Sequence, residues 1–434
     1  MSSTGPHAPT INSSHFKDFQ TEGEPLNLVS AAQSLTKFAS KKIARGNAFR
    51  QIHSNPELFS VIPRGATRYR AALYFADGMV NAYQIRQWYE PLRQLSESIP
   101  LVVIVRNPRT AIALQKECPL PVYFARTIGD IENILESQQI DAVFYVNQNI
   151  RNFQMMRFND PAHVFICHGE SEKAYMWSNQ LKAYDYVFSA GLAAQERLGK
   201  NLNRFDVQDR TRLVGRPQID VDYDAPVTLN PSLPTVLYAP TWEGDRPSMR
   251  YGSVVSHGVD LIDSLVKDGG FNIIFRPHPR SGINDARYSE ALKSLHARLD
   301  EADKTSSATL YYDDSPQWGW QWANSDLGIT DISAVSYDYL ATGKPLFITK
   351  PLSTEATVDD SPALLRVPGL SAADAAEAPR IIRDRLLSKD NSYNDLVEHY
   401  FGDTTRGASM QRFIDASLEI INETHVLNKE AGRA

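Results

Sequence analysis

Two short stretches, each an apolar run that stops at or near a histidine, are the parts of this sequence best suited to chemistry. Residues 164–167 lead directly into His168, and residues 272–275 lead through Arg276 to His278. An imidazole takes up or releases a proton near neutral pH, so either histidine could serve as a general acid or base. The alternative is that each is a strand-end histidine held by backbone hydrogen bonds, without a chemical role.

The two apolar runs predict where these histidines lie. Both runs are too short and too apolar for amphipathic helices and are typical of buried parallel strands. Ligands of open α/β sheets bind beyond the carboxyl ends of the strands, which is where both histidines are expected. Gly169 allows the backbone to turn after the first histidine, and Pro277 and Pro279 stiffen the backbone around the second.

A third stretch, residues 329–345, carries groups that suit phosphate. A strand ending at Thr330 is followed by Asp331 and Ser333, which are helix-capping residue types, and by a helix from about Ala334. The free N–H groups at such a helix start favour an anion. An isolated cap, however, means only that a helix begins there.

A fourth stretch is a strand, 236–239, that runs into a Pro-Thr-Trp turn. The hydroxyl of Thr241 can donate to a phosphate oxygen, and Trp242 either flanks a base or packs in the core. Trp318 and Trp322 are four residues apart, a spacing that favours a core or interdomain stripe over a ligand platform.

Composition and charge restrict the class of protein. The chain has 434 residues, 42% hydrophobic and 22% charged, which is typical of a globular protein with more than one domain. A net charge of −6 argues against general nucleic-acid binding. The two cysteines, Cys118 and Cys167, indicate a reducing compartment and no cysteine-based zinc site. Because no stretch approaches the ~20 apolar residues of a membrane span and the N-terminus lacks a signal-peptide core, we expect a cytoplasmic location.

The strand and helix signals predict two α/β domains after an N-terminal extension. The expected parts are a disordered tail (1–27), a basic amphipathic helical segment (28–60), an N-terminal α/β domain (61–222) and a C-terminal α/β domain with C-terminal helices (233–434). Strands are expected at 71–75, 101–105, 122–124, 142–146, 164–167, 186–188, 212–214, 236–239, 272–275, 309–312, 327–330 and 346–348. Strands that alternate with helices in this way indicate parallel, doubly wound sheets.

Two features of the expected linkers and termini allow more than one interpretation. Residues 28–52 read as a helix with a basic face, which would suit an anionic membrane surface or would simply pack on the next domain. Residues 220–234 read as the interdomain linker and include an acidic run from Asp220 to Asp224. A calcium loop would need glycine and glutamate at its sixth and twelfth positions, where Ala225 and Pro231 stand, so we expect no metal site.

Taken in order, these stretches resemble the CDP-glycerol glycerophosphotransferase family of teichoic-acid polymerases and primases. The resemblance covers about residues 164–351 and rests on five motifs: His168-Gly169 with Lys173; Gly215-Arg216-Pro217 with Asp220; Tyr238-Ala239-Pro240-Thr241-Trp242; Arg276-Pro277-His278-Pro279; and Asp331-Ile332-Ser333 with Asp338-Tyr339. The sequence departs from the family pattern at Glu170, Thr330, Ala334 and Glu243, where the family has threonine, serine, serine and commonly arginine.

The resemblance implies a GT-B fold, two Rossmann-like doubly wound domains that face each other across a cleft. It further implies that the N-terminal domain (61–222) lies on the acceptor side and that the C-terminal domain (233–434) binds the nucleotide donor. It also implies attack of an acceptor hydroxyl on the β-phosphate of a CDP-linked alditol, most simply CDP-glycerol, with release of CMP and without a cofactor. The expected partners are that donor and a lipid-linked or polysaccharide acceptor, with peripheral attachment to the inner face of the plasma membrane.

The same resemblance implies roles for particular residues. His168 and His278 are the expected catalytic pair, with Gly169 and Lys173 on the acceptor side. The expected donor-binding residues are Arg276, Thr241, Asp331, Ser333, Ala334, Ser336 and Asp338. Two other functions stay open at this point: a GT-B glycosyltransferase or epimerase that uses a nucleotide sugar, and an inactive scaffold of the same fold.

Overall fold

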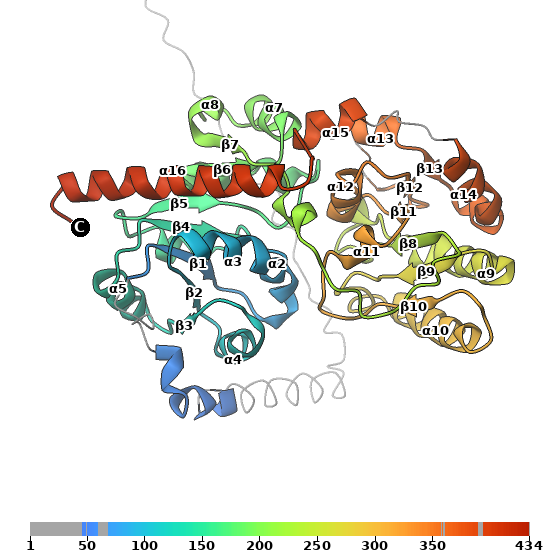
Figure 1. The fold of residues 1–434 in the computed structure, drawn as a ribbon, viewed down its shortest axis with the longest axis horizontal. Helices are drawn as coiled ribbons and strands as arrows, with labels where there is room; N and C mark the ends of the chain where they lie inside the picture. The colour runs from blue at the N-terminus through green and yellow to red at the C-terminus, as the bar shows by residue number, and fades with distance from the viewer. Residues whose placement is uncertain are drawn as a thin grey trace, which may run out of the picture. The chain divides into compact units, whose positions relative to one another are not determined.

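The computed structural model describes residues 46–48, 50–59, 68–356, 358, 361–388 and 394–433 (Figure 1). The chain divides into residues 1–50 and 51–434, and the elements named below belong to the second unit. Residues 46–48 and 50–53 are helical. The predicted tail and most of the predicted basic helix, residues 1–45, lie outside the described residues.

The first sheet contains only parallel strands, in the order β3-β2-β1-β4-β5-β6-β7. Their side chains are almost all buried on both faces of the sheet. The strands are therefore short apolar runs, without alternation of apolar and polar residues. The strands are β1 (Ala71–Phe75), β2 (Leu101–Val105), β3 (Val122–Phe124), β4 (Ala142–Tyr145), β5 (Ala162–Phe165), β6 (Tyr186–Ser189) and β7 (Thr211–Leu213). Each lies within two residues of its predicted position.

The helical segments between these strands include residues 82–96, which are interrupted near their middle. Residues 82–96 form two helices with Gln87 and Trp88 between them. Pro91 has no N–H to bond the carbonyl of Gln87, so the helix breaks there. The segments are η1 (Pro56–Phe59), η2 (Met79–Asn81), α2 (Ala82–Arg86), α3 (Tyr89–Ser98), α4 (Pro108–Glu117), α5 (Ile128–Ser137), α6 (Asn152–Met155), η3 (Ala174–Trp177), η4 (Asn179–Ala183), α7 (Leu192–Asn201), α8 (Val207–Arg210) and η5 (Pro217–Asp220).

The second sheet repeats the plan of the first, with parallel strands in the order β10-β9-β8-β11-β12-β13. The strands are β8 (Thr235–Ala239), β9 (Asn272–Phe275), β10 (Leu310–Tyr312), β11 (Leu327–Thr330), β12 (Leu346–Thr349) and β13 (Gly369–Leu370). The two-residue strand β13 was not predicted, because two residues are too short to give a period.

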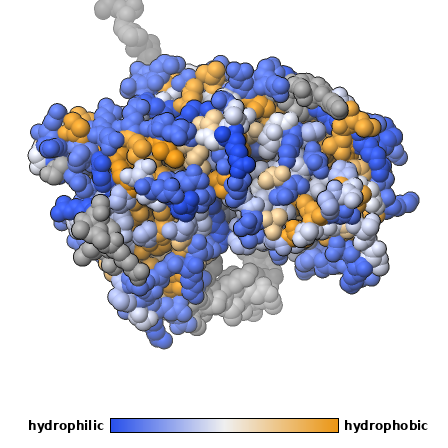
Figure 2. Space-filling view, viewed as in Figure 1, coloured by the Kyte–Doolittle hydropathy of each residue, from blue (hydrophilic) through white to orange (hydrophobic). Residues whose placement is uncertain are grey.

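The remaining helical segments lie after β8 in the chain. They are η6 (Pro247–Met249), η7 (Val254–Gly258), α9 (Val259–Asp268), α10 (Ala286–Asp303), α11 (Trp320–Ala323), α12 (Ala334–Leu340), α13 (Pro362–Arg366), η8 (Ala372–Glu377), α14 (Ala378–Leu387), α15 (Asn394–Phe401) and α16 (Ala408–Glu430). None of the helices within the described ranges is long and apolar enough to cross a membrane. Figure 2 shows hydrophilic and hydrophobic residues interspersed over the face in view.

Both sheets change strand order at a switch point, between β1 and β4 and between β8 and β11. Strands on the two sides of such a point are followed by connections that leave toward opposite faces, which opens a crevice for a ligand. Thr241 follows β8, and Asp331 follows β11. The residue types predicted to hold phosphate therefore lie at the switch point of the second sheet.

The last helix, α16, departs from the predicted division of the chain. We expected residues 233–434 to lie together, yet α16 packs against α3, β4, β5 and η5 of the first domain (Figure 1). The ring of Phe413 has its centroid 5.2 Å from that of Trp88 and 6.1 Å from that of Phe188. The sequence indicates a helix here but does not show which surface it packs on. In the structure that surface belongs to the first domain.

Replacement of Phe413 tests how much the packing of α16 on the first domain stabilises the fold. Phe413 is fully buried, so Phe413→Ala should remove about 3–5 kcal/mol of packing and lower the melting temperature. Leu427→Ala is the matched control, because Leu427 lies on the same helix but is 58% exposed and should change stability by no more than about 0.5 kcal/mol. Equal melting temperatures for the two variants would show that α16 does not anchor the first domain.

Candidate active site

A cavity of about 310 Å³ lies between the two domains and brings both predicted histidines together. Its walls come from the loops after β5, β8, β9 and β10 and from the starts of α2 and α12. The lining residues are Tyr83, Gln87, His168, Ser171, Lys173, Tyr175, Leu237, Ala239, Pro240, Thr241, Trp242, Met249, Arg276, Pro277, His278, Pro279, Arg280, Trp318, Gln321, Trp322, Ser333, Ala334, Val335 and Asp338. Trp318 and Trp322 are therefore at the cavity wall as well as in contact with each other.

His168 is held just beyond β5 by an unusual backbone. Cys167 has a φ of 56°, and the indole N–H of Trp88 donates to the Cys167 carbonyl at 2.5 Å. A non-glycine residue in this region is strained, so its neighbours must hold it there. The Nδ1 atom of His168 lies 3.0 Å from the Val146 carbonyl, which can only accept. Nδ1 therefore carries the proton, and Nε2 keeps a free lone pair.

His278 is held in the opposite tautomer. The backbone N–H of Arg280 donates to His278 Nδ1 at 3.1 Å, so Nδ1 must be the unprotonated nitrogen. The proton of the neutral ring then lies on Nε2. The two imidazoles consequently present different groups from opposite domains: His168 an acceptor, and His278 a donor.

Both histidines are neutral in this site at pH 7. Burial lowers the pKa of His168 to about 4, and the positive charge of Arg216 acts in the same direction. Burial lowers the pKa of His278 to about 3, and Lys173 and Arg280 lower it further. A bound anion would raise both pKa values, because it would offset these positive charges.

Lys173 reaches from the His168 loop to the second domain. Its Nζ lies 5.3 Å from the centroid of the Tyr251 ring, and the side chain lines the cavity. Burial lowers the pKa of Lys173 to about 8, while the charge of Asp331 opposes that shift. We predicted this lysine on the acceptor side; its loop belongs to the first domain, and its ammonium group contacts the second.

Arg276 forms an ion pair within its own domain. Its guanidinium forms a buried ion pair with Asp313, and Gln321 Nε2 donates to the same carboxylate oxygen at 2.6 Å. The guanidinium carbon lies 5.5 Å from the centroid of Trp318. The side chain still lines the cavity, so its remaining N–H groups are the ones that face a ligand.

Asp331 ties together the loops around the phosphate-type residues. Its carboxylate accepts from the backbone N–H groups of Thr241 at 2.7 Å and Ser253 at 3.0 Å, and from the hydroxyl of Thr349 at 2.6 Å. Burial raises the pKa of Asp331 to about 6 against these hydrogen bonds. Asp331 is not among the residues that line the cavity, so its place is structural support for Thr241.

The start of α12 contributes three of the predicted residues to the cavity and one to its support. Ser333, Ala334 and Asp338 line the cavity. Ser336 instead bonds within the turn: its hydroxyl donates to the Asp331 carbonyl and accepts from Thr330 and from the Ser333 N–H. It fixes the local backbone and does not reach the cavity.

Gly169 and Ala334 meet across the two domains. A Cβ added at Gly169 would lie 2.8 Å from the Cβ of Ala334, closer than two side chains can approach. The loop after His168 and the start of α12 are therefore in direct contact. Gly169, which has no Cβ, leaves room for this contact.

Arg216 forms a second link between the domains. Its Nε donates to Asp338 Oδ1 at 2.6 Å, and its Nη2 donates to Gln87 at 2.8 Å and to the His168 carbonyl at 3.3 Å. Both ion-pair partners are almost fully buried. Asp338 Oδ2 has no hydrogen-bond partner among the described residues, so a ligand in the cavity could use it.

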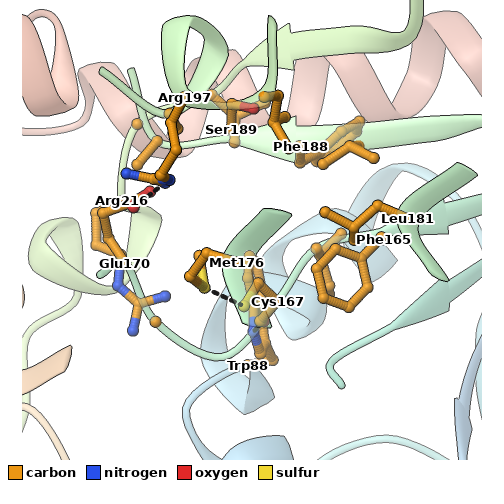
Figure 3. Close-up of a pocket in the computed structure, with 18 residues that line it drawn as sticks. Trp88, Phe165, Cys167, Glu170, Met176, Leu181, Phe188, Ser189, Arg197 and Arg216 are labelled. Carbon is orange, nitrogen blue, oxygen red and sulfur yellow. Dashed lines mark hydrogen bonds and ion pairs between the residues drawn. The ribbon is translucent and has the colours of Figure 1, made fainter. Parts of the chain in front are cut away.

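The departure at Glu170 is compensated by Arg197 of α7. The guanidinium of Arg197 pairs with the carboxylates of Glu170 and Glu172, and the hydroxyl of Tyr400 donates to Glu172 at 2.8 Å. A cavity of about 40 Å³ lies behind the His168 loop, with Glu170, Arg197 and Arg216 on one side of it and apolar side chains on the other (Figure 3). Glu170 therefore holds the loop after His168 in place through Arg197.

The departure at Glu243 also has a structural partner. Its carboxylate accepts from the backbone N–H groups of Gly282 at 2.9 Å and Asn284 at 2.7 Å. These residues follow His278 and Arg280, so Glu243 fixes the far side of the His278 turn. Arg280 in turn stacks over Trp242, with the guanidinium carbon 4.1 Å from the ring centroid.

Sequence reasoning missed several cavity residues. Tyr83 and Gln87 lie in no motif and reach the cavity through tertiary packing, whereas Ser171 and Arg280 lie on the loops of the His168 and His278 motifs but are not motif positions. Arg216 stood in a quoted motif, Gly215-Arg216-Pro217, but a motif does not show its partner Asp338. Within the described ranges, no group of three or more His, Cys, Asp or Glu residues could hold a metal ion.

The Arg216–Asp338 pair can be tested by a double-mutant cycle. Arg216→Met should cost about 3–5 kcal/mol of stability, because it leaves a buried carboxylate without its partner. Adding Asp338→Asn should recover most of that loss, since the amide needs no counter-charge. Melting temperatures of the two single variants and the double variant decide the matter; additive losses would show that the two side chains do not depend on each other.

Part of the chain that forms this site matches a known protein family. A family model for CDP-glycerol:poly(glycerophosphate) glycerophosphotransferase matches residues 168–351, which begin at His168 and include His278 and α12. No curated protein matches the sequence as a whole.

Solved structures show the fold. The wall teichoic acid polymerase TagF has 14% identity and a TM-score of 0.56, with 89% of this chain and 98% of that chain covered. A putative UDP-N-acetylglucosamine 2-epimerase from Listeria monocytogenes has 12% identity and a TM-score of 0.52, with 82% and 97% covered. The UDP-GlcNAc 2-epimerase from Neisseria meningitidis has 9% identity and a TM-score of 0.50, with 81% and 100% covered. These enzymes have the GT-B fold, which is confirmed for this chain. Over residues 168–351, the chain is similar to the CDP-glycerol:poly(glycerophosphate) glycerophosphotransferase family, the family whose motifs it resembles.

Proposed function

We propose that this protein transfers an alditol phosphate, most simply glycerol phosphate, from a CDP-linked donor to a hydroxyl of a cell-wall or capsule polymer. The observation that carries the proposal is that His168 and His278, from opposite domains, line one cavity and present opposite tautomers. The family match supports a glycerophosphotransferase. A matched structure of a TagF variant soaked with CDPG supports a CDP-linked donor.

The proposed step exchanges one phosphorus–oxygen bond for another. The acceptor hydroxyl oxygen attacks the β-phosphorus of the donor and forms the new phosphodiester bond. The bond from that phosphorus to the bridging oxygen breaks, and the electron pair leaves with CMP. The hydroxyl proton moves to a base of the protein, and the product CMP carries the negative charge away.

His168 is the proposed base. Its Nε2 holds a free lone pair because its Nδ1–H is bound to the Val146 carbonyl. A base must be unprotonated before the reaction, and the lowered pKa of His168 keeps it so at pH 7. The donor's negative charge would raise this pKa once bound, which makes proton uptake easier in the complex.

His278 is the proposed hydrogen-bond donor to the pyrophosphate. A neutral imidazole that donates through Nε2–H stabilises negative charge without giving up a proton. Lys173 and Arg280 add positive charge close to it. We place Arg276, Thr241, Ser333 and the backbone of Ala334 on the same phosphates, and we place the partnerless Asp338 Oδ2 on a donor hydroxyl. Asp331 and Ser336 hold this wall in position.

The acceptor and the location follow from the same proposal. A polymer acceptor would approach from the first domain, where Gly169 and Lys173 follow the base. A lipid-linked acceptor would place the protein peripherally at the cytoplasmic face of the plasma membrane. Residues 28–52, mostly outside the described residues, are the segment we propose for an anionic surface.

A nucleotide-sugar enzyme is the second candidate, because two of the matched structures are UDP-GlcNAc 2-epimerases. Such an enzyme would break a carbon–oxygen bond at the sugar and release a nucleoside diphosphate. A panel of CDP-alditols and UDP-sugars separates the two, since only the proposed reaction releases CMP.

Replacement of the histidines tests the mechanism. His168→Ala and His278→Ala should each lower CMP release on the order of 10²–10⁴-fold, the range for a lost acid–base group. His278→Ala should also weaken donor binding measured by calorimetry, whereas His168→Ala should bind the donor nearly as well as the wild type. His296→Ala is the control, because His296 is exposed and stacks on Tyr312 of β10. A folded His278→Ala protein with full donor affinity and turnover would remove that residue from the mechanism.

The pH dependence tests the role of Lys173. Its pKa is lowered to about 8 by burial, so its positive charge is present below pH 8 and is lost above it. The value of kcat/KM for the donor should therefore fall as pH rises through about 8. Lys173→Arg keeps the charge at all accessible pH values and should remove this limb from the profile. If the limb is unchanged in Lys173→Arg, another group is responsible.

A further inference from the structure

Tyr83 contacts both histidines of the cavity. It belongs to α2 of the first domain, far outside the family match over residues 168–351. Its ring centroid lies 6.0 Å from that of His168 and 5.6 Å from that of His278, with interplanar angles of 84° and 72°. Among the ring contacts of the described residues, this tyrosine alone joins the two imidazoles.

We propose that Tyr83 is a positioning residue for both histidines: its ring orients the two imidazoles edge-to-face and shields them from water when the domains meet. Edge-to-face contacts between aromatic rings fix relative orientation and are favourable by about 0.5–1.5 kcal/mol beyond burial. Because His278 belongs to the second domain, its contact with Tyr83 exists only when that domain lies against the first.

The two histidines depend on Tyr83 to different degrees. The ring of Tyr175 also stacks on His168, with centroids 6.1 Å apart and an angle of 16°. His168 thus lies between two aromatic rings. Tyr83 is the ring that packs on His278 among the described residues, so loss of Tyr83 should affect that histidine more strongly.

The surroundings of the two imidazoles set the direction of the effect. Around His168 the charged groups are Asp77, Lys173 and Arg216, and around His278 they are Lys173, Arg276 and Arg280, with the titratable imidazole of His168 beside them. Most of these groups are positive. Water that enters in place of the Tyr83 ring would solvate the imidazolium forms and screen this repulsion, so the pKa of both histidines should rise.

The ring, and not the hydroxyl, makes these contacts. The hydroxyl of Tyr83 accepts a hydrogen bond from Nε2 of its neighbour Gln84 at 3.3 Å. Tyr83→Phe keeps the ring and removes only that bond. It therefore separates the proposed role from any role of the hydroxyl.

Histidine titration in the full chain tests the inference directly. The protein has ten histidines, so His168 and His278 are assigned in ¹³C-histidine NMR spectra by the resonances lost in His168→Ala and His278→Ala. Tyr83→Ala should raise the pKa of both by about one unit or more, with His278 moving further. Tyr83→Phe should keep the wild-type pKa values, and Tyr175→Ala should move that of His168 alone.

Three results would overturn the inference. They are unchanged titrations in a folded Tyr83→Ala protein, equal shifts in Tyr83→Phe, and a shift of His278 in Tyr175→Ala as large as that in Tyr83→Ala. If Tyr83→Ala does not fold, as judged by its melting curve, Tyr83→Leu takes its place, because leucine keeps most of the volume but lacks the ring.

A kinetic measurement links Tyr83 to the proposed function. This measurement rests on the proposed function, whereas the NMR titration does not. Tyr83→Ala should lower kcat for CMP release on the order of 10- to 100-fold, the scale for a misplaced reactive group, with little change in KM. An absence of CMP release from every protein, the wild type included, would refute the proposed function and leave the NMR result to decide on Tyr83.

Discussion

Burial of two imidazoles in one cavity is the constraint on which the rest of this structure depends. Two neutral imidazoles offer different groups to the cavity when Nε2 of one is unprotonated and Nε2 of the other carries the proton. The Val146 carbonyl fixes His168 as an acceptor at Nε2, and the Arg280 N–H fixes His278 as a donor at Nε2. Both fixing groups are backbone atoms at the ends of loops from different sheets. The tautomers of both imidazoles are therefore set by backbone groups, and side chains around the cavity hold that backbone in place.

Many contacts elsewhere in the structure hold the backbone next to His168 and the turn after His278. Trp88 holds the strained carbonyl of Cys167 next to His168, and Glu243 holds the turn after His278. Arg216 joins the first of these loops to α12 of the second domain. Two of the departures from the family pattern, Glu170 and Glu243, belong to this set of supports, and their partners are Arg197 and backbone N–H groups. Glu170 and Glu243 change the contacts that hold the loops after His168 and His278, and both histidines still line the cavity.

The sequence predicted the parts of this account that depend on local pattern. Buried parallel strands are short apolar runs, so β5 and β9 were recognisable, and their carboxyl ends placed His168 and His278 at a binding edge. Thr241 after β8 and Ser333 before α12 followed from the same rule. The sequence could not predict contacts between segments far apart. Asp313 as the partner of Arg276, Asp338 as the partner of Arg216, and the first sheet as the surface under α16 are all products of packing. Tyr83 had no signal, because a tyrosine on a short helix is ordinary until the second domain lies against it.

A crystal structure of the protein with CDP-glycerol at neutral pH would test the central claim most directly. The account predicts that the pyrophosphate lies in the cavity between the domains, with a β-phosphate oxygen within hydrogen-bond distance of His278 Nε2. It also predicts that His168 Nε2 faces the β-phosphorus with room for an acceptor hydroxyl between them. A donor whose pyrophosphate lies outside this cavity, or whose β-phosphate contacts neither imidazole, would contradict the account.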